Sequence, residues 1–383
     1  MRARTIVYVQ YTNPAAYPPL QHSAGILAEA GWDVVVAGIS MPCVAQLKFA
    51  AHSRIDVRLA NPAPSRGGAQ KLHYLGFCIW VLGCILRRQA GWVYVSDVLA
   101  TPIGWLASFL PGVRVVYHEH DSPAREQRSA FMRRLLRFRQ RLLNRAAIVI
   151  APNAERAKTI AEDAGTAIPL VSVWNCPRRV EATAPPERHE IRESWIVYQG
   201  SIVPARLPRA LIEALSLVSP CVKLRVIGYE TAGHTGYISE LASLADSLGI
   251  GERVEFIPTV PRAQLLEWTD RSQIGLSLMP MQTDEINERW MRGASNKTFE
   301  YLARGVPVLV SDLPEWRATF VDAGFGCACR PDDPRSIADA LSWFHEHADD
   351  RRRMGERGRQ RILTDWNYER QFEPVLRLMT VAG

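Results

Sequence analysis

The clearest candidates for binding chemistry lie in one short segment, residues 294–312, which reads ASNKTFEYLARGVPVLVSD. Two small polar residues, Ser295 and Asn296, precede apolar residues at helical spacing, and a glycine and a proline separate these from a short apolar run. The pattern predicts a loop, a helix, a turn and a buried strand. Lys297 lies in the first turn of this helix, and Glu300 follows one turn later.

The start of such a helix suits a phosphate. Its first N–H groups have no intrahelical partner and its dipole is positive there, while Lys297 adds a formal charge. Glu300 can accept hydrogen bonds from a diol such as a ribose, so a diphosphate and a ribose would lie along one helix face. The same pattern also fits a capped crossover helix of any α/β domain with a solvated Glu300, and these residues alone leave both interpretations open.

A second candidate phosphate contact lies earlier in the chain. Residues 195–198 predict a strand that runs into Gly200 and Ser201, and a short loop then ends at Arg206 before a predicted helix over 208–217. A strand, a glycine and a basic residue that lead into a helix can hold a diphosphate. This pattern is short and therefore less specific than the first.

Polar residues also follow predicted strands in the N-terminal half of the chain. The candidates are Asn13, Asp97, His118, Glu119, His120 and Asp121. Open α/β sheets bind ligands at the carboxyl ends of their parallel strands, so these residues predict a binding site. Adjacent His118 and Glu119 point to different sides of a strand and no further ligand group has usable spacing, so we expect no metal here.

Residues 125–145 predict a helix with eight arginines and one acid. Four of the arginines lie off its apolar face: Arg133, Arg134, Arg137 and Arg141. They form either a solvated basic face or a surface for anionic lipid headgroups or a lipid diphosphate. Because no stacking aromatic residues or known binding module accompany them, we expect no nucleic acid partner.

Composition indicates a globular protein of two domains. The chain has 383 residues, of which 47% are hydrophobic and 22% charged, and a net charge of +7 that favours an anionic partner. Its seven cysteines are scattered without a C-x-x-C pair, which predicts neither a disulfide framework nor a zinc site. The start of the chain lacks the pattern of a signal peptide, so we expect a cytoplasmic location.

Strands and helices alternate in both halves and predict two parallel α/β sheets. The first βα loop lacks G-x-G-x-x-G, which favours the N-terminal half as the acceptor domain. Residues 71–88 predict a helix whose apolar run is too short to span a membrane. It is either a buried crossover helix or a helix at a membrane interface, and we favour the buried helix. We expect domains at 1–178 and 191–365, joined by a proline-containing linker at 179–190.

Three of these segments resemble retaining glycosyltransferases of family 4. Residues 294–312 are similar to the family's (S/P)-N-K-x-F-E-Y-x-A-x-G-x-P-V element, whose Glu holds the ribose of a nucleotide sugar. Residues 200–206 are similar to its G-R-L-x-x-x-K loop, with Ser201 in place of the arginine and Arg206 in place of the lysine. Residues 115–121 are similar to its V-V-Y-D-x-H-E strand end.

The resemblance implies a GT-B fold, in which two Rossmann-like β/α/β domains face a central cleft and a last helix, residues 366–383, packs back on the N-terminal domain. It places the sugar-contacting histidine on His120, with His118 where an aspartate is usual. It implies a donor site with the nucleobase beside Pro258 and Thr259, and catalytic roles for His120, Arg206 and Lys297. The implied donor residues are Gly200, Ser201, Arg206, Pro258, Thr259, Ser295, Asn296, Lys297 and Glu300.

One residue departs from the family pattern. Members commonly carry a second glutamate eight positions before the ribose glutamate, where this chain has Arg292. Glu285 and Glu288 are the nearby acids that can substitute for it.

The resemblance implies a retaining hexosyltransferase of polysaccharide biosynthesis. The donor would be a UDP or GDP sugar and the acceptor a lipid-linked molecule or a glycan, with no cofactor or metal. The enzyme would work in the cytoplasm and bind as a peripheral protein to the inner face of the plasma membrane. Two alternatives remain: a sugar-nucleotide epimerase of the same fold, and a non-catalytic membrane-associated protein that binds nucleotide sugars.

Overall fold

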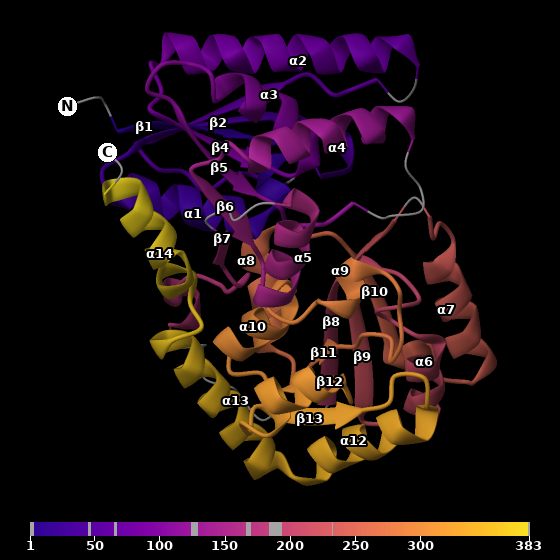
Figure 1. Ribbon diagram of the computed structural model, residues 1–383. Helices are drawn as coiled ribbons and strands as arrows, with labels where there is room; N and C mark the ends of the chain where they lie inside the picture. Colours follow the sequence, from indigo (N-terminus) through magenta and orange to yellow (C-terminus); the bar gives the residue numbers. More distant parts are fainter. Residues whose placement is uncertain are drawn as a thin grey trace. The chain divides into compact units, whose positions relative to one another are not determined.

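The computed structural model describes residues 4–44, 47–64, 67–123, 129–165, 170–183, 194–231 and 233–381. The chain divides into two compact units (Figure 1). Unit 1 comprises Met1–Asn175, Glu285–Ala294 and Tyr368–Gly383, and unit 2 comprises Cys176–Asp284 and Ser295–Asn367. Each unit contains one parallel sheet, as the alternation of strands and helices predicted.

Unit 1 is built on seven parallel strands in the order β3-β2-β1-β4-β5-β6-β7. Residues of the central strands are apolar on both faces, and all five residues of β1 and of β4 are buried, because helices cover both sides of the sheet. The strands are β1 (Thr5–Val9), β2 (Asp33–Ile39), β3 (Ile55–Ala60), β4 (Trp92–Ser96), β5 (Arg114–His118), β6 (Ile148–Ala151) and β7 (Leu170–Ser172).

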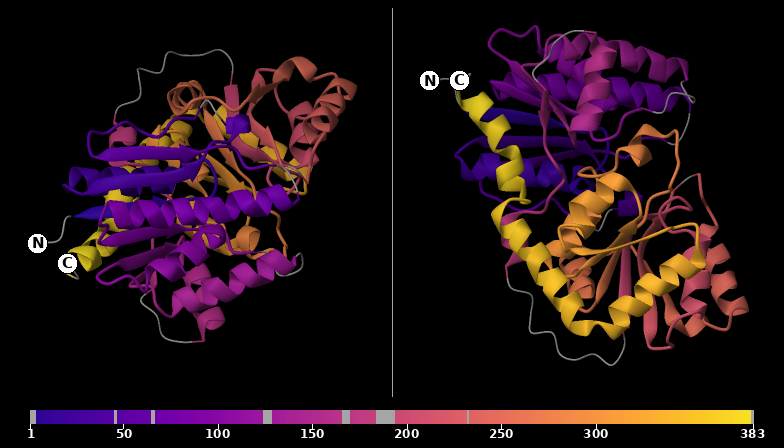
Figure 2. Two further views of the ribbon diagram at one scale, coloured as in Figure 1. Left: turned by 90° about the horizontal axis from the view of Figure 1, so that it is seen from above. Right: turned by 60° about the horizontal axis from the view of Figure 1, so that its bottom comes forward.

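Two helices cover one face of this sheet, and four cover the other (Figures 1 and 2). On one face, α1 (Pro18–Glu29) and α14 (Tyr368–Val381) pack Leu20, Leu27, Phe372 and Met379 against the strands. The other face carries α2 (Gly68–Arg87), α3 (Thr101–Ala107), α4 (Ala130–Leu143) and α5 (Ala154–Ala164). Short turns complete the unit: η1 (Pro14–Ala16), η2 (Pro42–Val44), η3 (Val98–Ala100) and α9 (Ile286–Arg289).

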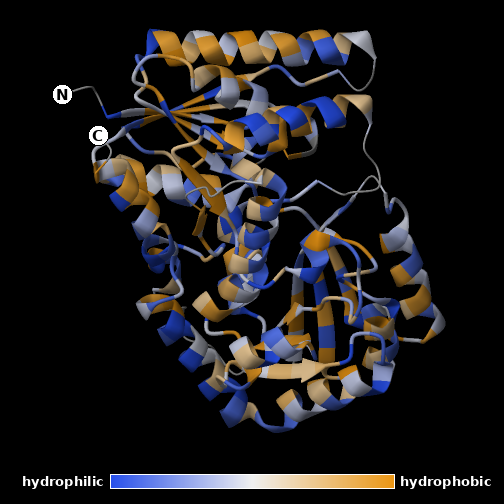
Figure 3. Ribbon diagram, in the orientation of Figure 1, coloured by the Kyte–Doolittle hydropathy of each residue, from blue (hydrophilic) through white to orange (hydrophobic). Residues whose placement is uncertain are grey.

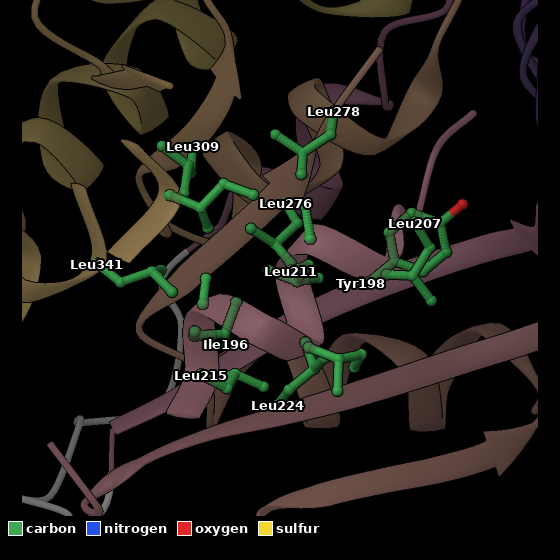
Figure 4. Packing of buried hydrophobic residues seen from close by; sticks show 14 of the residues in the cluster. Ile196, Tyr198, Leu207, Leu211, Leu215, Leu224, Leu276, Leu278, Leu309 and Leu341 are labelled. Carbon is green, nitrogen blue, oxygen red and sulfur yellow. The ribbon is translucent and has the colours of Figure 1, made fainter. Parts of the chain in front are cut away.

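Unit 2 has six parallel strands in the order β10-β9-β8-β11-β12-β13. Its core is formed by side chains of these strands and of α6 (Arg209–Ser216), α7 (Tyr237–Ser247) and α12 (Pro334–Glu346), among them Ile196, Leu211, Leu276 and Leu341 (Figure 4). The strands are β8 (Ser194–Ile202), β9 (Val222–Glu230), β10 (Val254–Pro258), β11 (Ile274–Ser277), β12 (Val308–Ser311) and β13 (Gly326–Cys329).

The remaining elements of unit 2 are helices and short turns. The helices are α6 (Arg209–Ser216), α7 (Tyr237–Ser247), α8 (Arg262–Asp270), α10 (Asn296–Ala303), α11 (Pro314–Trp316), α12 (Pro334–Glu346) and α13 (Ala348–Thr364). The turns are η4 (Arg179–Ala182), η5 (Gly251–Arg253) and η6 (Arg317–Val321).

Several expected boundaries differ from those of the structure. The segment Glu285–Ala294, assigned from the sequence to the C-terminal domain, groups with unit 1. The first five residues of the expected linker include the turn η4, whereas residues 184–190 lie outside the described residues. Likewise α4 begins at Ala130, and residues 125–128 of the expected arginine-rich helix lie outside the described part of the chain.

Helix α2 is buried on one face only. Phe77, Cys78, Val81, Cys84 and Ile85 enter the core of unit 1, while a stripe on another face is more than half exposed. This stripe consists of Leu72, Leu75, Ile79 and Leu86. Among the described helices, α2 alone is long and apolar enough to cross a membrane, and Figure 3 shows the many hydrophobic residues along it. Core burial was therefore a correct prediction for one face of this helix only.

Candidate active site

The predicted donor residues of unit 2 gather at one edge of its sheet. In the register of the strands, Gly200 of β8 lies beside Gly228 of β9, which lies beside Pro258 of β10. Thr259 follows directly. Strand β8 continues through Gly200 and Ser201, so the predicted loop is shorter than expected. Predicted donor residues on β8 and β10 thus lie on either side of β9, at the same level of the sheet.

Two glycines allow close approach at this edge. Gly200 has a φ of +114°, which favours glycine, and a Cβ there would lie 2.8 Å from Cε and 3.1 Å from Nζ of Lys297. A Cβ on Gly228 would lie 1.8 Å from the carbonyl oxygen of Gly200. The Lys297 ammonium group therefore lies close to the Gly200 backbone, where any other residue would place a side chain. It is within reach of a group that binds at this edge.

Two cations meet beside Gly200. Arg206 donates a hydrogen bond of 2.9 Å from Nη1 to the hydroxyl of Ser201. Ser201, which stands where the family has an arginine, therefore orients Arg206. Lys297 lies 5.5 Å from the centre of the Tyr198 ring. Burial lowers the pKa of Lys297 to about 7, the charge of Arg206 acts in the same direction, and Glu300 opposes them.

Three buried polar atoms at this site have no hydrogen-bond partner among the described residues. They are Oγ of Ser295, Oδ1 of Asn296 and Nε of Arg206. Buried polar groups in folded proteins are nearly always paired, so such a cluster indicates a place for a polar ligand. All three belong to residues that the sequence predicted as donor contacts or as the loop end before α6.

Glu300 is buried, with 6% of its surface exposed, so it is no solvated helix residue. Gln199 donates from Nε2 to its Oε2, and Arg262 donates from Nη1 to its Oε1 at 2.8 Å. Arg262 also binds Glu181 through Nε at 2.9 Å and through Nη2. This carboxylate is therefore held in one orientation by residues 101 and 38 positions away.

The sequence did not identify Gln199, Arg262 or Glu181. Gln199 directly precedes the predicted Gly200 in the same strand, and this adjacency was the one sequence signal for it. Arg262 and Glu181 reach Glu300 only through tertiary contacts, and no local spacing marks them. They lie on the first turn of α8 and on η4.

The predicted residues of unit 1 form a separate cluster around two histidines. The rings of His118 and His120 have centroids 3.8 Å apart, and Nδ1 of His118 lies 2.5 Å from the hydroxyl of Tyr94. Burial lowers the pKa of His120 to about 4 and that of His118 well below its usual range, so both are neutral at pH 7. Nε2 of each ring has no hydrogen-bond partner among the described residues.

Asp97 belongs to this cluster, with a left-handed backbone at a φ of +62°. Its Oδ1 accepts a hydrogen bond of 2.9 Å from the backbone N–H of His120. Burial raises the pKa of Asp97 to about 7, and the charge of Asp121 adds to this effect. The neighbouring Asp121 side chain is largely exposed and lies 3.5 Å from Arg156.

Glu119 and Asn13 are held by internal contacts of unit 1. Glu119 is buried and accepts hydrogen bonds from Tyr117 at 2.7 Å, from Ser122 at 2.8 Å and from Arg139. Asn13 caps η1 by accepting from Ala15 N–H at 3.0 Å. Both lie among the predicted acceptor residues, but their polar atoms hold the surrounding loops.

Arg156 is a buried residue that the sequence did not single out. It donates to the carbonyl oxygens of His120 at 2.6 Å, Asn287 at 2.7 Å and Trp290 at 3.1 Å. It therefore ties the strand end that bears His120 to the segment Glu285–Ala294. Its position on α5 gave no sequence signal, because arginine in a helix is normally a surface residue.

Arg292 also belongs to this segment of unit 1. Its Nη2 lies 2.6 Å from Oε1 of Glu155, so the residue that replaces the family's second glutamate forms an ion pair within unit 1. Glu285 and Glu288, the predicted substitutes, lie in the same segment around α9. All three residues thus belong to unit 1, whereas the predicted donor residues belong to unit 2.

The four predicted membrane arginines are exposed on α4, whereas Arg139 of the same helix is buried. Arg141 stacks 5.4 Å from the ring of Trp105 on α3. Among the described residues, no group of three or more His, Cys, Asp or Glu side chains has the arrangement of a metal site.

Both units match known sequence families. Residues 20–176 match the family described as "Glycosyl transferase 4-like domain", and residues 205–377 match the family described as "Glycosyl transferase-like". The D-inositol 3-phosphate glycosyltransferase of Nocardia farcinica (strain IFM 10152) is 23% identical over 286 residues. That match covers 71% of this chain but only 59% of the relative, so the chain spans about three fifths of its length.

Solved structures show the same fold. Anabaena Alr3699/HepE, solved in complex with UDP and glucose, has a TM-score of 0.73 at 17% identity and covers 98% of this chain and 99% of its own. A glycosyltransferase from Rickettsia africae ESF-5 has a TM-score of 0.73 at 12% identity, with coverage of 100% and 99%. WaaG, a glycosyltransferase involved in lipopolysaccharide biosynthesis, has a TM-score of 0.67 at 14% identity, with coverage of 98% and 99%. The predicted GT-B fold is confirmed.

Proposed function

The chain belongs to the group 1, family 4-like glycosyltransferases, and from this premise we propose that it transfers a hexose from a nucleoside diphosphate sugar to an acceptor with retention of configuration. The observation that carries the proposal is the donor edge of unit 2. There Lys297 and Arg206 flank Gly200, and Ser295 and Asn296 present buried polar atoms with no partner among the described residues.

The donor diphosphate binds at this edge, and its ribose binds to Glu300. When the bond between the sugar and the diphosphate breaks, negative charge develops on the leaving phosphate oxygen. Lys297, Arg206 and the N-terminus of α10 stabilise that charge, and they are already in place before the reaction. No metal ion or other cofactor is required for this stabilisation.

Retention follows from attack on the face that the diphosphate leaves. The acceptor oxygen bonds to the anomeric carbon as the bond to the phosphate oxygen breaks, and the hydroxyl proton passes to that phosphate oxygen. His120 contacts the sugar as a neutral imidazole, because burial lowers its pKa to about 4. The role of His120 rests on the resemblance of residues 115–121 to the family's strand end.

The donor is a UDP or GDP sugar, and UDP is favoured because HepE was solved with UDP and with UDP-glucose. The acceptor is a lipid-linked molecule or a glycan at an anionic membrane. Support for the membrane comes from unit 1, where α2 exposes its apolar stripe and α4 exposes Arg133, Arg134, Arg137 and Arg141. We propose that the enzyme works at the cytoplasmic face of that membrane.

Donor binding and turnover test this function. UDP, GDP or their sugars should raise the melting temperature of the protein, because a ligand that binds only the folded state stabilises it. Arg206→Ala should reduce turnover at least about tenfold through lost charge stabilisation, whereas Arg206→Lys should retain part of it. Arg209→Ala is the matched control, since Arg209 is exposed and pairs with Glu240 on α7.

Unchanged turnover in Arg206→Ala would contradict the assignment. Incubation of the protein with a nucleotide sugar alone separates the two alternatives, because an epimerase produces an isomer without any acceptor. Binding of nucleotide sugar without product in the presence of acceptor extracts would identify a non-catalytic protein.

A further inference from the structure

Arg262 forms a bridge between the ribose-binding residue and a second carboxylate. Its Nη1 donates to Oε1 of Glu300 at 2.8 Å, while its Nε donates to Oε2 of Glu181 at 2.9 Å. About one third of the Arg262 side chain is exposed, whereas Glu300 and Glu181 are 8% and 13% exposed. The two acids therefore hold the guanidinium group from both sides.

The far end of this bridge is itself fixed. Oε1 of Glu181 accepts a hydrogen bond of 3.2 Å from the backbone N–H of Arg178, which closes the turn η4. The backbone carbonyl of Glu181 accepts from Nη1 of Arg304 at 2.9 Å. Glu181 is thus a rigid support, and the position of Arg262 does not depend on a flexible surface side chain.

The acceptor capacity of Glu300 sets what it can still bind. An ionised carboxylate offers about four lone-pair directions, two on each oxygen. Arg262 uses one on Oε1, and Gln199 uses one on Oε2. One direction remains on each oxygen, which matches the two O–H donors of a vicinal diol.

We propose that Arg262 is a positioning residue that makes the donor site specific for a nucleotide with an intact ribose diol. It acts by holding the Glu300 carboxylate rotated so that both free acceptor directions are available. The inference rests on the proposed function, because it assumes that a nucleoside diphosphate occupies this edge. Arg262 itself does not contact the reacting atoms.

Equilibrium binding of two probes to the full chain tests the inference. Wild-type protein should bind UDP more tightly than 2′,3′-dideoxy-UDP, which lacks both hydroxyl groups. In Arg262→Ala the Kd for UDP should rise at least about tenfold, as for loss of a charged hydrogen bond, while the Kd for the dideoxy probe should change less than about twofold. Arg262→Gln, which keeps a polar side chain, should give an intermediate loss for UDP.

The variants separate positioning from a general loss of structure. Arg271→Ala is the control, because Arg271 ends the same helix and lies over Trp268 at 5.6 Å. Glu181→Gln should weaken UDP binding in the same direction as Arg262→Ala, and the double variant should lose less than the sum. An equal loss for both probes in Arg262→Ala and Arg262→Gln would overturn the positioning role. Failure of the wild-type protein to bind UDP and GDP would instead overturn the proposed function.

Discussion

Lys297 is the residue whose chemistry depends most on the state of the donor site. It is buried beside Arg206, and its pKa is lowered to about 7 by burial and by that neighbouring charge. A diphosphate beside its ammonium group would favour the charged form and raise this pKa. Donor binding is therefore coupled to proton uptake at pH values above about 7.

This coupling predicts a pH dependence of UDP affinity. Below pH 7 Lys297 is already charged in the free protein, so its charge adds no pH dependence. Above pH 7 the free protein loses this proton while the complex keeps it, so the Kd should rise with pH, by up to about tenfold per pH unit, between pH 7 and 9. Isothermal titration calorimetry in buffers of different ionisation enthalpy measures the proton uptake.

Lys297→Arg is the control for this prediction, because an arginine side chain stays charged throughout the range. It should flatten the profile between pH 7 and 9. An identical slope in the wild-type protein and in Lys297→Arg would assign the pH dependence to another group.

Local sequence patterns identified residues that act close to one another along the chain. Ser295, Asn296, Lys297 and Glu300 lie at the start of one helix, and their spacing fitted a phosphate and a ribose but also a capped crossover helix. Arg262 remained unpredicted, because it meets Glu300 across 38 positions and the contact depends on how α8 packs in unit 2. Sequence spacing describes one element well and contacts between elements poorly.

At the scale of elements, helix α4 serves two purposes with the same residue type. Arg133, Arg134, Arg137 and Arg141 are exposed, whereas Arg139 turns inward and pairs with the buried Glu119. The sequence indicated an arginine-rich face but not this exception. Successive residues of a helix are turned by about 100°, so Arg139 lies on the apolar side although exposed arginines are close to it in the sequence.

Removal of Arg139 should destabilise unit 1. Arg139→Met leaves the Glu119 carboxylate buried without its cation, which costs about 3–5 kcal/mol for pairs of this kind. Urea unfolding should show a lower midpoint for the transition of unit 1. Arg137→Met, an exposed neighbour on the same helix, should change the midpoint little. Equal midpoints for the two variants would show that the ion pair contributes nothing.

Helix α2 shows where hydropathy alone is ambiguous. Apolar residues lie on most of its surface, so the sequence favoured burial, yet only one face enters the core. Its exposed stripe and the α4 arginines belong to the same face of the unit 1 sheet, since α3 packs against both helices. Which side of an apolar helix is covered depends on the neighbours that the fold supplies.

At the scale of the whole molecule, this combination predicts binding to anionic membranes. The protein should float with vesicles that contain phosphatidylglycerol and remain free with vesicles of phosphatidylcholine alone. Each arginine near an anionic surface contributes about 1 kcal/mol, so Arg133→Gln/Arg134→Gln/Arg137→Gln should weaken binding about a hundredfold. Ile79→Glu should also weaken it, by charging the exposed stripe of α2.

A matched triple variant controls for net charge. Arg330, Arg352 and Arg353 are exposed in unit 2, and each pairs with a nearby aspartate. Their replacement by glutamine should leave vesicle binding nearly unchanged. Equal loss in the two triple variants would mean that only overall charge matters, and no lipid dependence would leave the α4 arginines as a solvated face.

The alternation of strands and helices was sufficient to predict two parallel sheets, because each βαβ unit has a local signature. It was not sufficient to predict how the chain is shared between the units. Glu285–Ala294 carries little apolar pattern, and it is held in unit 1 by Arg156, by Asn153 and by reciprocal hydrogen bonds between Ser122 and Asn287. Those contacts involve residues more than 130 positions apart.

This sharing of the chain has a consequence for biosynthesis. Unit 1 combines segments that precede and follow unit 2 along the chain, since α14 covers one face of its sheet. Until α14 is synthesised, one face of the unit 1 sheet stays uncovered. This face includes Ile6, Tyr8, Val34 and Val36, which pack against Tyr368, Phe372 and Met379 in the complete unit. Unit 2 can close before unit 1 is complete. The sheet of unit 1 therefore receives the cover of α14 only after the segments of unit 2 have been synthesised.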